Sequence, residues 1–221
     1  LIIDKGFNRQ ECKESMENSL IKLKVDLNKT DFLLTHMHSD HTGLVSSLTR
    51  EESKIFSSRE DAKIISLGRE SGHWEDMKNF ARKIGFPEDE VVTLIEEHPG
   101  FKYAPQIETE IDFVAEGEVL KVGDYYFKCL KTPGHTQGHI CLYERNKKLL
   151  IAGDLILDSI TPNISLWSDD KNNLKQYLDS LNRISNLEID LILAGHRNII
   201  SNWEERIEEL LEFMELTDKK K

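Results

Sequence analysis

The sequence predicts an α/β protein, and three observations carry that prediction. Short apolar runs bounded by glycine or polar residues recur along the chain, and segments of helical periodicity lie between them. Several of the apolar runs end on a histidine or an aspartate. With 221 residues, of which 38% are hydrophobic and 31% charged, the chain is long enough to bury a substantial core.

The first 57 residues are expected to alternate strand and helix. Residues 1–4 (LIID) form a short apolar strand, and a helix follows whose apolar face carries Cys12, Met16, Leu20 and Leu23. Residues 31–35 (DFLLT) form the next strand, and residues 54–57 (KIFS) a weaker one. A strand followed by a helix indicates α/β architecture.

The segment from about residue 59 to residue 103 differs from its surroundings. It is polar and compatible with helix, and Gly68, Gly72, Gly85 and Pro87 interrupt it. We therefore expect two or three short helices that form an insertion or lid. The chain shows no repeat or linker, so residues 1–221 are predicted to be a single domain that contains this insertion.

Closely spaced strands are expected after the insertion. They cover residues 111–114 (IDFV), 119–132 (VLKVGDYYFKCLKT), 139–144 (HICLYE) and 148–153 (KLLIAG). Gly123 and Asp124 mark a turn within the second of these runs. This spacing favours hairpins in a mixed or antiparallel sheet.

The last 50 residues are expected to form a helix, a strand and a second helix. The first helix has an apolar face of Leu174, Tyr177, Leu178, Leu181 and Ile184. Residues 190–195 (DLILAG) form a buried strand. Ser201 and Glu204 form a capping box for the final helix, which carries the stripe Trp203, Ile207, Leu210, Leu211 and Met214.

Charge and cysteine usage narrow the class of protein. The formal net charge of -11 (29 Lys and Arg against 40 Asp and Glu) disfavours attraction to nucleic acid. Three cysteines without a C-x-x-C spacing disfavour a disulfide framework.

We expect a cytoplasmic protein with no membrane partner. Leu1 opens within a predicted strand, so residues upstream are expected and a targeting signal there is left open.

The stretch THMHSDH crowds four coordinating side chains into six positions: His36, His38, Asp40 and His41. Without an ion these polar groups would be desolvated together, and the imidazoles would repel one another on protonation. His73, His98 and His139 stand apart from this cluster. They are expected to have structural roles, with His73 as a weaker candidate for a lid residue.

Four apolar runs each end on a potential metal ligand, namely His36, His135, Asp154 and His196. Strands that deliver polar side chains from their ends can bring them together above an apolar core. The glycines at 134, 153 and 195 permit sharp turns there. Nitrogen and oxygen donors suit zinc, and also iron or manganese, so we expect two divalent ions, with Asp154 as the natural bridge.

The ordered set His36-x-His38-x-Asp40-His41, TPGH at His135, AGD at Asp154 and AGH at His196 resembles the metallo-β-lactamase superfamily. The resemblance implies an αββα sandwich of two mixed β-sheets with flanking helices, although strands that normally precede residues 1–4 are missing. It places metal one on His36, His38 and His135, and metal two on Asp40, His41 and His196. Asp154 would bridge the ions, and Asp4 would support the loop.

The complete ligand set is more similar to the glyoxalase II-like and lactonase-like branches than to true β-lactamases. A metal-bridging hydroxide is therefore expected to attack an ester, thioester or lactone-type acyl carbon of a small molecule. Asp40 and Asp154 are the expected catalytic residues. A substrate pocket is expected from Asn163, Trp167, His73, Trp74 and Tyr103, although these aromatic side chains could equally serve packing.

Two alternatives remain open at this point. The first is a metal-dependent phosphodiesterase or ribonuclease, against which the acidic composition counts. The second is a non-hydrolytic di-iron or regulatory metal-binding protein, and no flavin-binding segment is apparent for a redox role. A glutathione thioester is a doubtful substrate because the chain ends soon after one acidic helix. The oligomeric state is not predicted.

Overall fold

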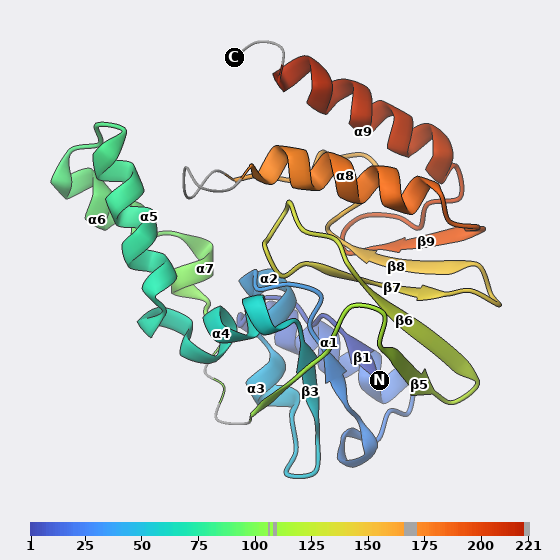
Figure 1. Cartoon of the computed structure of the whole chain (residues 1–221). Helices are drawn as coiled ribbons and strands as arrows, with labels where there is room; N and C mark the ends of the chain where they lie inside the picture. The colour runs from blue at the N-terminus through green and yellow to red at the C-terminus, as the bar shows by residue number, and fades with distance from the viewer. Residues whose placement is uncertain (106, 108–109, 166–171, 219–221) are drawn as a thin grey trace. The chain divides into compact units, whose positions relative to one another are not determined.

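Two β-sheets organise the chain, one in each half. The computed structural model describes residues 1–105, 107, 110–165 and 172–218, which divide into two units, Leu1–Phe113 and Val114–Lys221 (Figure 1). Each unit has its own sheet and its own helices. The expected α/β class is therefore confirmed, whereas the single-domain division of residues 1–221 stays a prediction.

The sheet of the first unit has the strand order β1-β2-β3-β4. Its strands are β1 (Ile2–Ile3), β2 (Phe32–Leu33), β3 (Ile55–Ser57) and β4 (Ile111–Phe113), and their described pairings are all parallel. Two mixed sheets were expected, but among the described strands only the second sheet combines parallel and antiparallel pairs. Strand β2 is buried along its whole length, since Phe32 and Leu33 have no exposed surface, whereas β4 buries Ile111 and exposes Asp112 and Phe113.

Helices of the first unit pack on this sheet and extend from it. Helix α1 (Gln10–Lys22) and helix α3 (Val45–Leu48) bury Leu20 and Leu48 against Phe32. Between residues 59 and 103 the chain forms α4 (Arg59–Leu67), a short 3₁₀ turn (Gly68–Glu70), α5 (Gly72–Lys83), α6 (Glu88–Glu96) and α7 (Pro99–Lys102). The described segment thus has more helices than the two or three expected, and α5 lies beside α6 (Figure 1).

The sheet of the second unit is mixed. Its strands, in spatial order, are β5 (Val119–Val122), β6 (Tyr125–Lys131), β7 (Ile140–Glu144), β8 (Leu149–Gly153) and β9 (Leu191–Ala194). The pairings from β5 to β8 are antiparallel, and β9 runs parallel to β8. Val122 pairs with Tyr125, and Gly123 has a φ of 59°, so the predicted turn is confirmed.

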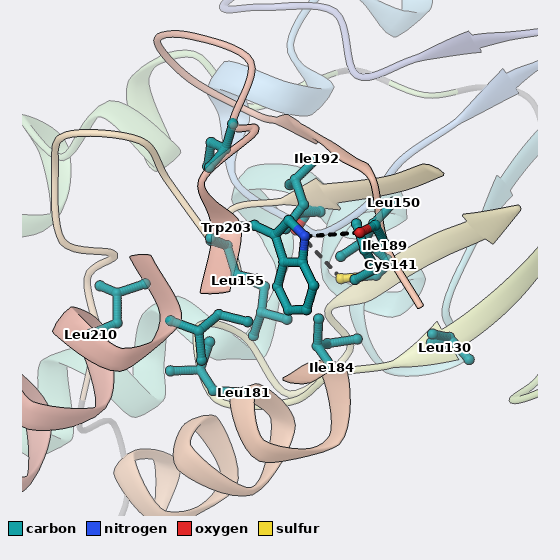
Figure 2. Close-up of a cluster of buried hydrophobic side chains, with 14 of the residues drawn as sticks. Leu130, Cys141, Leu150, Leu155, Leu181, Ile184, Ile189, Ile192, Trp203 and Leu210 are labelled. Atoms are coloured by element: carbon teal, nitrogen blue, oxygen red, sulfur yellow. Dashed lines mark hydrogen bonds between the residues drawn. The ribbon is translucent and has the colours of Figure 1, made fainter. Parts of the chain in front are cut away.

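Helices α8 (Asn173–Ser185) and α9 (Trp203–Asp218) contribute buried side chains to the core of the second unit, together with the strands of its sheet. The indole N–H of Trp203 donates to the carbonyl oxygen of Ile189 at 2.9 Å, so this buried donor is satisfied (Figure 2). The expected capping box at Ser201 is wrong, because helix α9 begins at Trp203 and the preceding position is therefore Asn202. The side-chain amide of Asn202 donates to the carboxylate of Glu205 at 3.4 Å, which is a contact between two side chains. Among the described residues, no helix combines the length and the apolar character needed to cross a bilayer.

Candidate metal centre

The loop that follows β2 carries the first set of ligands, and it lies in the first unit. His36 and His41 are buried, and the short helix α2 (Ser39–Thr42) presents Asp40 and His41 from consecutive positions. The ring centroid of His36 lies 4.8 Å from that of His38 and 4.1 Å from that of His41. The four side chains predicted from the sequence therefore gather at one place.

Asp4 fixes the orientation of this loop. Its carboxylate accepts hydrogen bonds from the backbone N–H and the hydroxyl of Thr35 at 2.9 and 2.7 Å. It also accepts from Nδ1 of His41 at 2.8 Å. Burial acts to raise the pKa of Asp4, but the contacts with His41 and Thr35 outweigh it and hold the pKa below its ordinary value. An ionised Asp4 therefore supports the loop, as the resemblance implied.

The hydrogen bonds determine which nitrogen of each histidine carries the proton. The Asp4 carboxylate can only accept, so Nδ1 of His41 is the donor. The hydroxyl of Thr35 donates to Asp4 and therefore accepts from Nδ1 of His36 at 2.9 Å. In the neutral rings, the lone pair of both histidines is then on Nε2. This is the arrangement in which a second partner orients an imidazole for a metal ion.

Other contacts hold the backbone of the same loop. The N–H of Met37 donates to Oδ2 of Asp61 at 3.0 Å, and the hydroxyl of Ser39 donates to the carbonyl of Pro99 at 3.1 Å. A side-chain carbon at Gly43 would lie 2.4 Å from the backbone nitrogen of Asn8, so only glycine fits there. The sequence did not single out Asp61. The spacing from Ser58 to Asp61 predicts the start of a helix, but it does not predict that the Asp61 carboxylate contacts Met37.

The second set of ligands lies in the second unit, and His135 follows strand β6. Gly134 has a φ of 140°, and a side-chain carbon there would lie 2.5 Å from Cα of Tyr177 in helix α8. The hydroxyl of Ser180, also in α8, donates to the carbonyl of Pro133 at 2.8 Å. Nδ1 of His135 donates to the carbonyl of Asn163 at 2.7 Å, which again leaves the lone pair on Nε2.

Asp154 and His196 follow β8 and β9, which are parallel neighbours, so both side chains emerge at the same sheet edge. Oδ2 of Asp154 lies 3.7 Å from Nε2 of His135 and 3.4 Å from Nε2 of His196. Asp154 is buried, whereas the side chain of His196 is 34% exposed. One carboxylate oxygen thus faces two imidazole nitrogens, as the expected bridging role requires.

His139 braces this second set without being one of the expected ligands. Its ring is buried, and Nε2 accepts the backbone N–H of Asp154 at 3.1 Å. Nδ1 contacts the hydroxyl of Thr132 at 2.8 Å. His98 also makes a structural contact, since its Nδ1 accepts the N–H of Gly100 at the start of α7. Both observations agree with the structural roles that the sequence suggested.

The donor set fits a divalent transition-metal ion. All the donors are imidazole nitrogens or carboxylate oxygens, which suit zinc, iron and manganese. Two donors on one tetrahedral zinc ion, each about 2.1 Å from it, are about 3.4 Å apart. The Asp154 contacts with His135 and His196 are near this spacing, and Oδ2 of Asp40 lies 3.8 Å from Nε2 of His41.

The residues expected to line a substrate pocket fall in different surroundings. Trp74 is buried, and its indole N–H donates to the carbonyl of Gly68 at 2.8 Å, which favours the packing alternative for this residue. His73 is half-buried, and burial lowers its pKa. Tyr103 is half-buried against the Phe7 ring. Asn163 is exposed, and Trp167 lies outside the described residues. A pocket role for these residues stays a prediction.

Comparisons with known proteins agree on one family. The family model described as "Metallo-beta-lactamase superfamily" matches residues 28–196. Hydroxyacylglutathione hydrolase GloC of Haemophilus influenzae is 30% identical over 70% of this chain, and the human acyl-coenzyme A thioesterase MBLAC2 is 23% identical over 90%. The chain spans 60% and 69% of the lengths of these two relatives. A metallo-beta-lactamase family protein from Thermus thermophilus superposes with a TM-score of 0.82 at 28% identity, over 96% of this chain and 70% of that protein.

Proposed function

Since the chain belongs to the metallo-beta-lactamase superfamily, we propose that it is a binuclear metal-dependent hydrolase of ester, thioester or lactone-type acyl bonds. The observation that carries the proposal is the contact of one Asp154 carboxylate oxygen with the Nε2 atoms of His135 and His196. A carboxylate oxygen that faces two imidazoles is suited to a shared metal ligand.

The proposed ligand assignment uses all seven side chains. His36, His38 and His135 would hold one ion, Asp40, His41 and His196 would hold the other, and Asp154 would contribute to both. Bound divalent cations would lower the pKa of a coordinated water to about 7 and polarise a substrate carbonyl. Zinc is the proposed ion because four-coordinate nitrogen and oxygen sites suit it, and iron and manganese are the alternatives.

The side chains of this chain would orient and move protons in that reaction. Asp4 and the carbonyl of Asn163 hold His41 and His135 in the tautomer that directs Nε2 toward an ion. Asp40 is half exposed, so the oxygen of its carboxylate that does not face an ion could accept a proton from the attacking water and pass it to solvent. His139 fixes the backbone of Asp154.

Thioesters are the substrates that we propose to test first. One relative is named as a hydroxyacylglutathione hydrolase and the other as an acyl-coenzyme A thioesterase. A small-molecule acyl substrate also agrees with the net charge of -11, which disfavours nucleic acid. The competing phosphodiesterase function would instead be indicated by cleavage of phosphodiesters at low salt.

The central test compares metal-loaded and chelator-treated protein on ester, thioester, lactone and phosphodiester substrates. Metal-loaded protein should hydrolyse at least one acyl substrate, and chelation should abolish that activity. Asp154→Ala should lower both metal content and turnover, the latter by about 100-fold or more, because each bridging contact is lost. Asp179→Ala, in the exposed part of α8, is the control. An Asp154→Ala protein with two bound ions and full activity would refute the assignment.

A further inference from the structure

We propose that Asp61 is a positioning residue for the metal ligands His36 and His38. The inference rests on the proposed metal-binding function, and it assigns to helix α4 a role that the ligand pattern does not show. Asp61 lies outside the ligand set and 24 residues from the loop that it contacts. Its carboxylate acts on the backbone between the two ligands.

The contact is specific in its geometry. Oδ2 of Asp61 accepts the N–H of Met37 at 3.0 Å, and Met37 is the residue between His36 and His38. This hydrogen bond restrains the peptide plane between His36 and Met37, which directly follows one proposed ligand and lies one residue before the other. Asp61 is 1% exposed, and a buried carboxylate that accepts a backbone N–H makes a stronger hydrogen bond than a neutral acceptor does.

Helix α4 holds Asp61 at this position. Ser58 is the N-cap of α4, and its hydroxyl accepts the backbone N–H of Asp61 at 3.2 Å. The capping function of the first turn therefore belongs to Ser58. The carboxylate of Asp61 is directed to the loop, where the N-terminal end of α4 also favours its negative charge.

A second contact ties the far end of the helical segment to the same loop. The hydroxyl of Ser39 donates to the carbonyl of Pro99 at 3.1 Å, and Pro99 begins α7. The segment expected as an insertion or lid thus touches the ligand loop through Asp61 near its start and Pro99 near its end. These two contacts brace the ligand loop from both ends of the segment, so the integrity of the segment should affect metal affinity.

The test measures metal affinity by competition with a chromophoric chelator, without any substrate. Asp61→Ala should weaken binding of at least one ion by about 10- to 100-fold, the usual effect of removing an outer-sphere partner of a metal ligand. Asp61→Asn keeps an oxygen acceptor of the same length, so its affinity should stay within a few-fold of the original. Asp89→Ala, exposed in α6 of the same segment, should have no effect.

A second readout reports on the hydrogen bond itself. In the metal-free protein, the Met37 amide should exchange with deuterium at least tenfold faster in Asp61→Ala than in the unmodified chain. A general loss of stability would instead speed exchange across the whole sheet of the first unit. If Asp61→Ala does not fold, Asp61→Ser replaces it, because serine suits the first turn of a helix but is too short to reach Met37.

Three outcomes would overturn the inference. They are unchanged metal affinity in Asp61→Ala, unchanged Met37 exchange, and a loss in Asp61→Asn as large as that in Asp61→Ala. The proposed function fails separately, if the unmodified chain binds metal but hydrolyses no acyl substrate. In that case the metal-affinity measurements, which need no substrate, still decide whether Asp61 positions the ligands.

Discussion

Burial shifts the pKa values of several titratable side chains away from their ordinary values. Burial raises the pKa of Cys129 and of Cys141 to about 12, so both thiols stay protonated at neutral pH. Burial lowers the pKa of Lys5 to about 7, an effect that Asp4 partly offsets, and its ammonium lies 5.1 Å from the centroid of the Phe32 ring. The burial of each side chain therefore determines its pKa as much as its residue type does.

The cysteines give a prediction at the residue scale. In native protein near pH 8, iodoacetamide should modify Cys12, which lies partly exposed in α1, and should leave Cys129 and Cys141 unmodified. Mass spectrometry of peptides before and after unfolding in urea would measure this. Rapid native labelling of Cys141 would contradict the burial and the raised pKa on which the prediction depends.

At the scale of elements, helix α8 serves as the platform for the His135 loop. Gly134 lies against the backbone of Tyr177, Ser180 bonds the carbonyl of Pro133, and the amide of Gln137 donates to the side chains of Asn173 and Gln176. The apolar face predicted for this helix is therefore only part of its function. Its N-terminal half also holds a proposed metal ligand in place.

Gly134→Ala tests that role. The added carbon would lie 2.5 Å from Tyr177, and the residue has a φ of 140°, so we expect the free energy of unfolding to fall by about 1–3 kcal/mol or more. Zinc affinity should fall as well, because the loop must move away from α8. Chemical denaturation and metal titration would measure both effects.

Gly123→Ala is the matched control. Gly123 also has a positive φ, of 59°, but no atom lies within 4 Å of the added carbon. It should therefore show the cost of the backbone conformation alone, about 1 kcal/mol, and no change in zinc affinity. Equal losses of stability and affinity in the two variants would argue against a specific contact between the loop and α8.

At the scale of the whole molecule, the proposed ligands come from both halves of the chain. Four precede residue 113 and three follow it, while the net charge of -11 leaves cation binding electrostatically favourable. Any ion held by the folded protein and not by the unfolded chain adds to its stability through mass action. Metal binding and folding should therefore be coupled.

That coupling can be measured by thermal unfolding. Zinc at 100 times its dissociation constant should raise the free energy of unfolding by about 2.7 kcal/mol per ion. In a chain of this length each kcal/mol is equivalent to about 2–4 °C in Tm. Calorimetry with zinc and with a chelator should thus differ by at least about 5 °C, and identical Tm values would contradict a metal centre. His73→Ala, outside the ligand set, should keep the full difference.

The sequence determined the features that local patterns encode. Four of the seven ligands of the predicted centre end apolar runs, and the other three follow His36 within five positions. The turn at Gly123 follows from residue type. The start of the final helix was predicted too early, because Ser201 and Asn202 both suit the position before a helix and local sequence does not separate them. These features depend on residues a few positions apart.

Only the tertiary structure decided which groups orient the ligands. Met37 and Asp61 are 24 positions apart, and His135 and Asn163 are 28 positions apart. Nothing in the sequence around Asn163 marks its carbonyl, because every residue has one. For Trp74, residue type allowed packing or a pocket role, and the hydrogen bond from its indole to the carbonyl of Gly68 favours packing. A hydrogen bond between distant residues depends on how the elements pack, and periodicity along the chain does not contain that information.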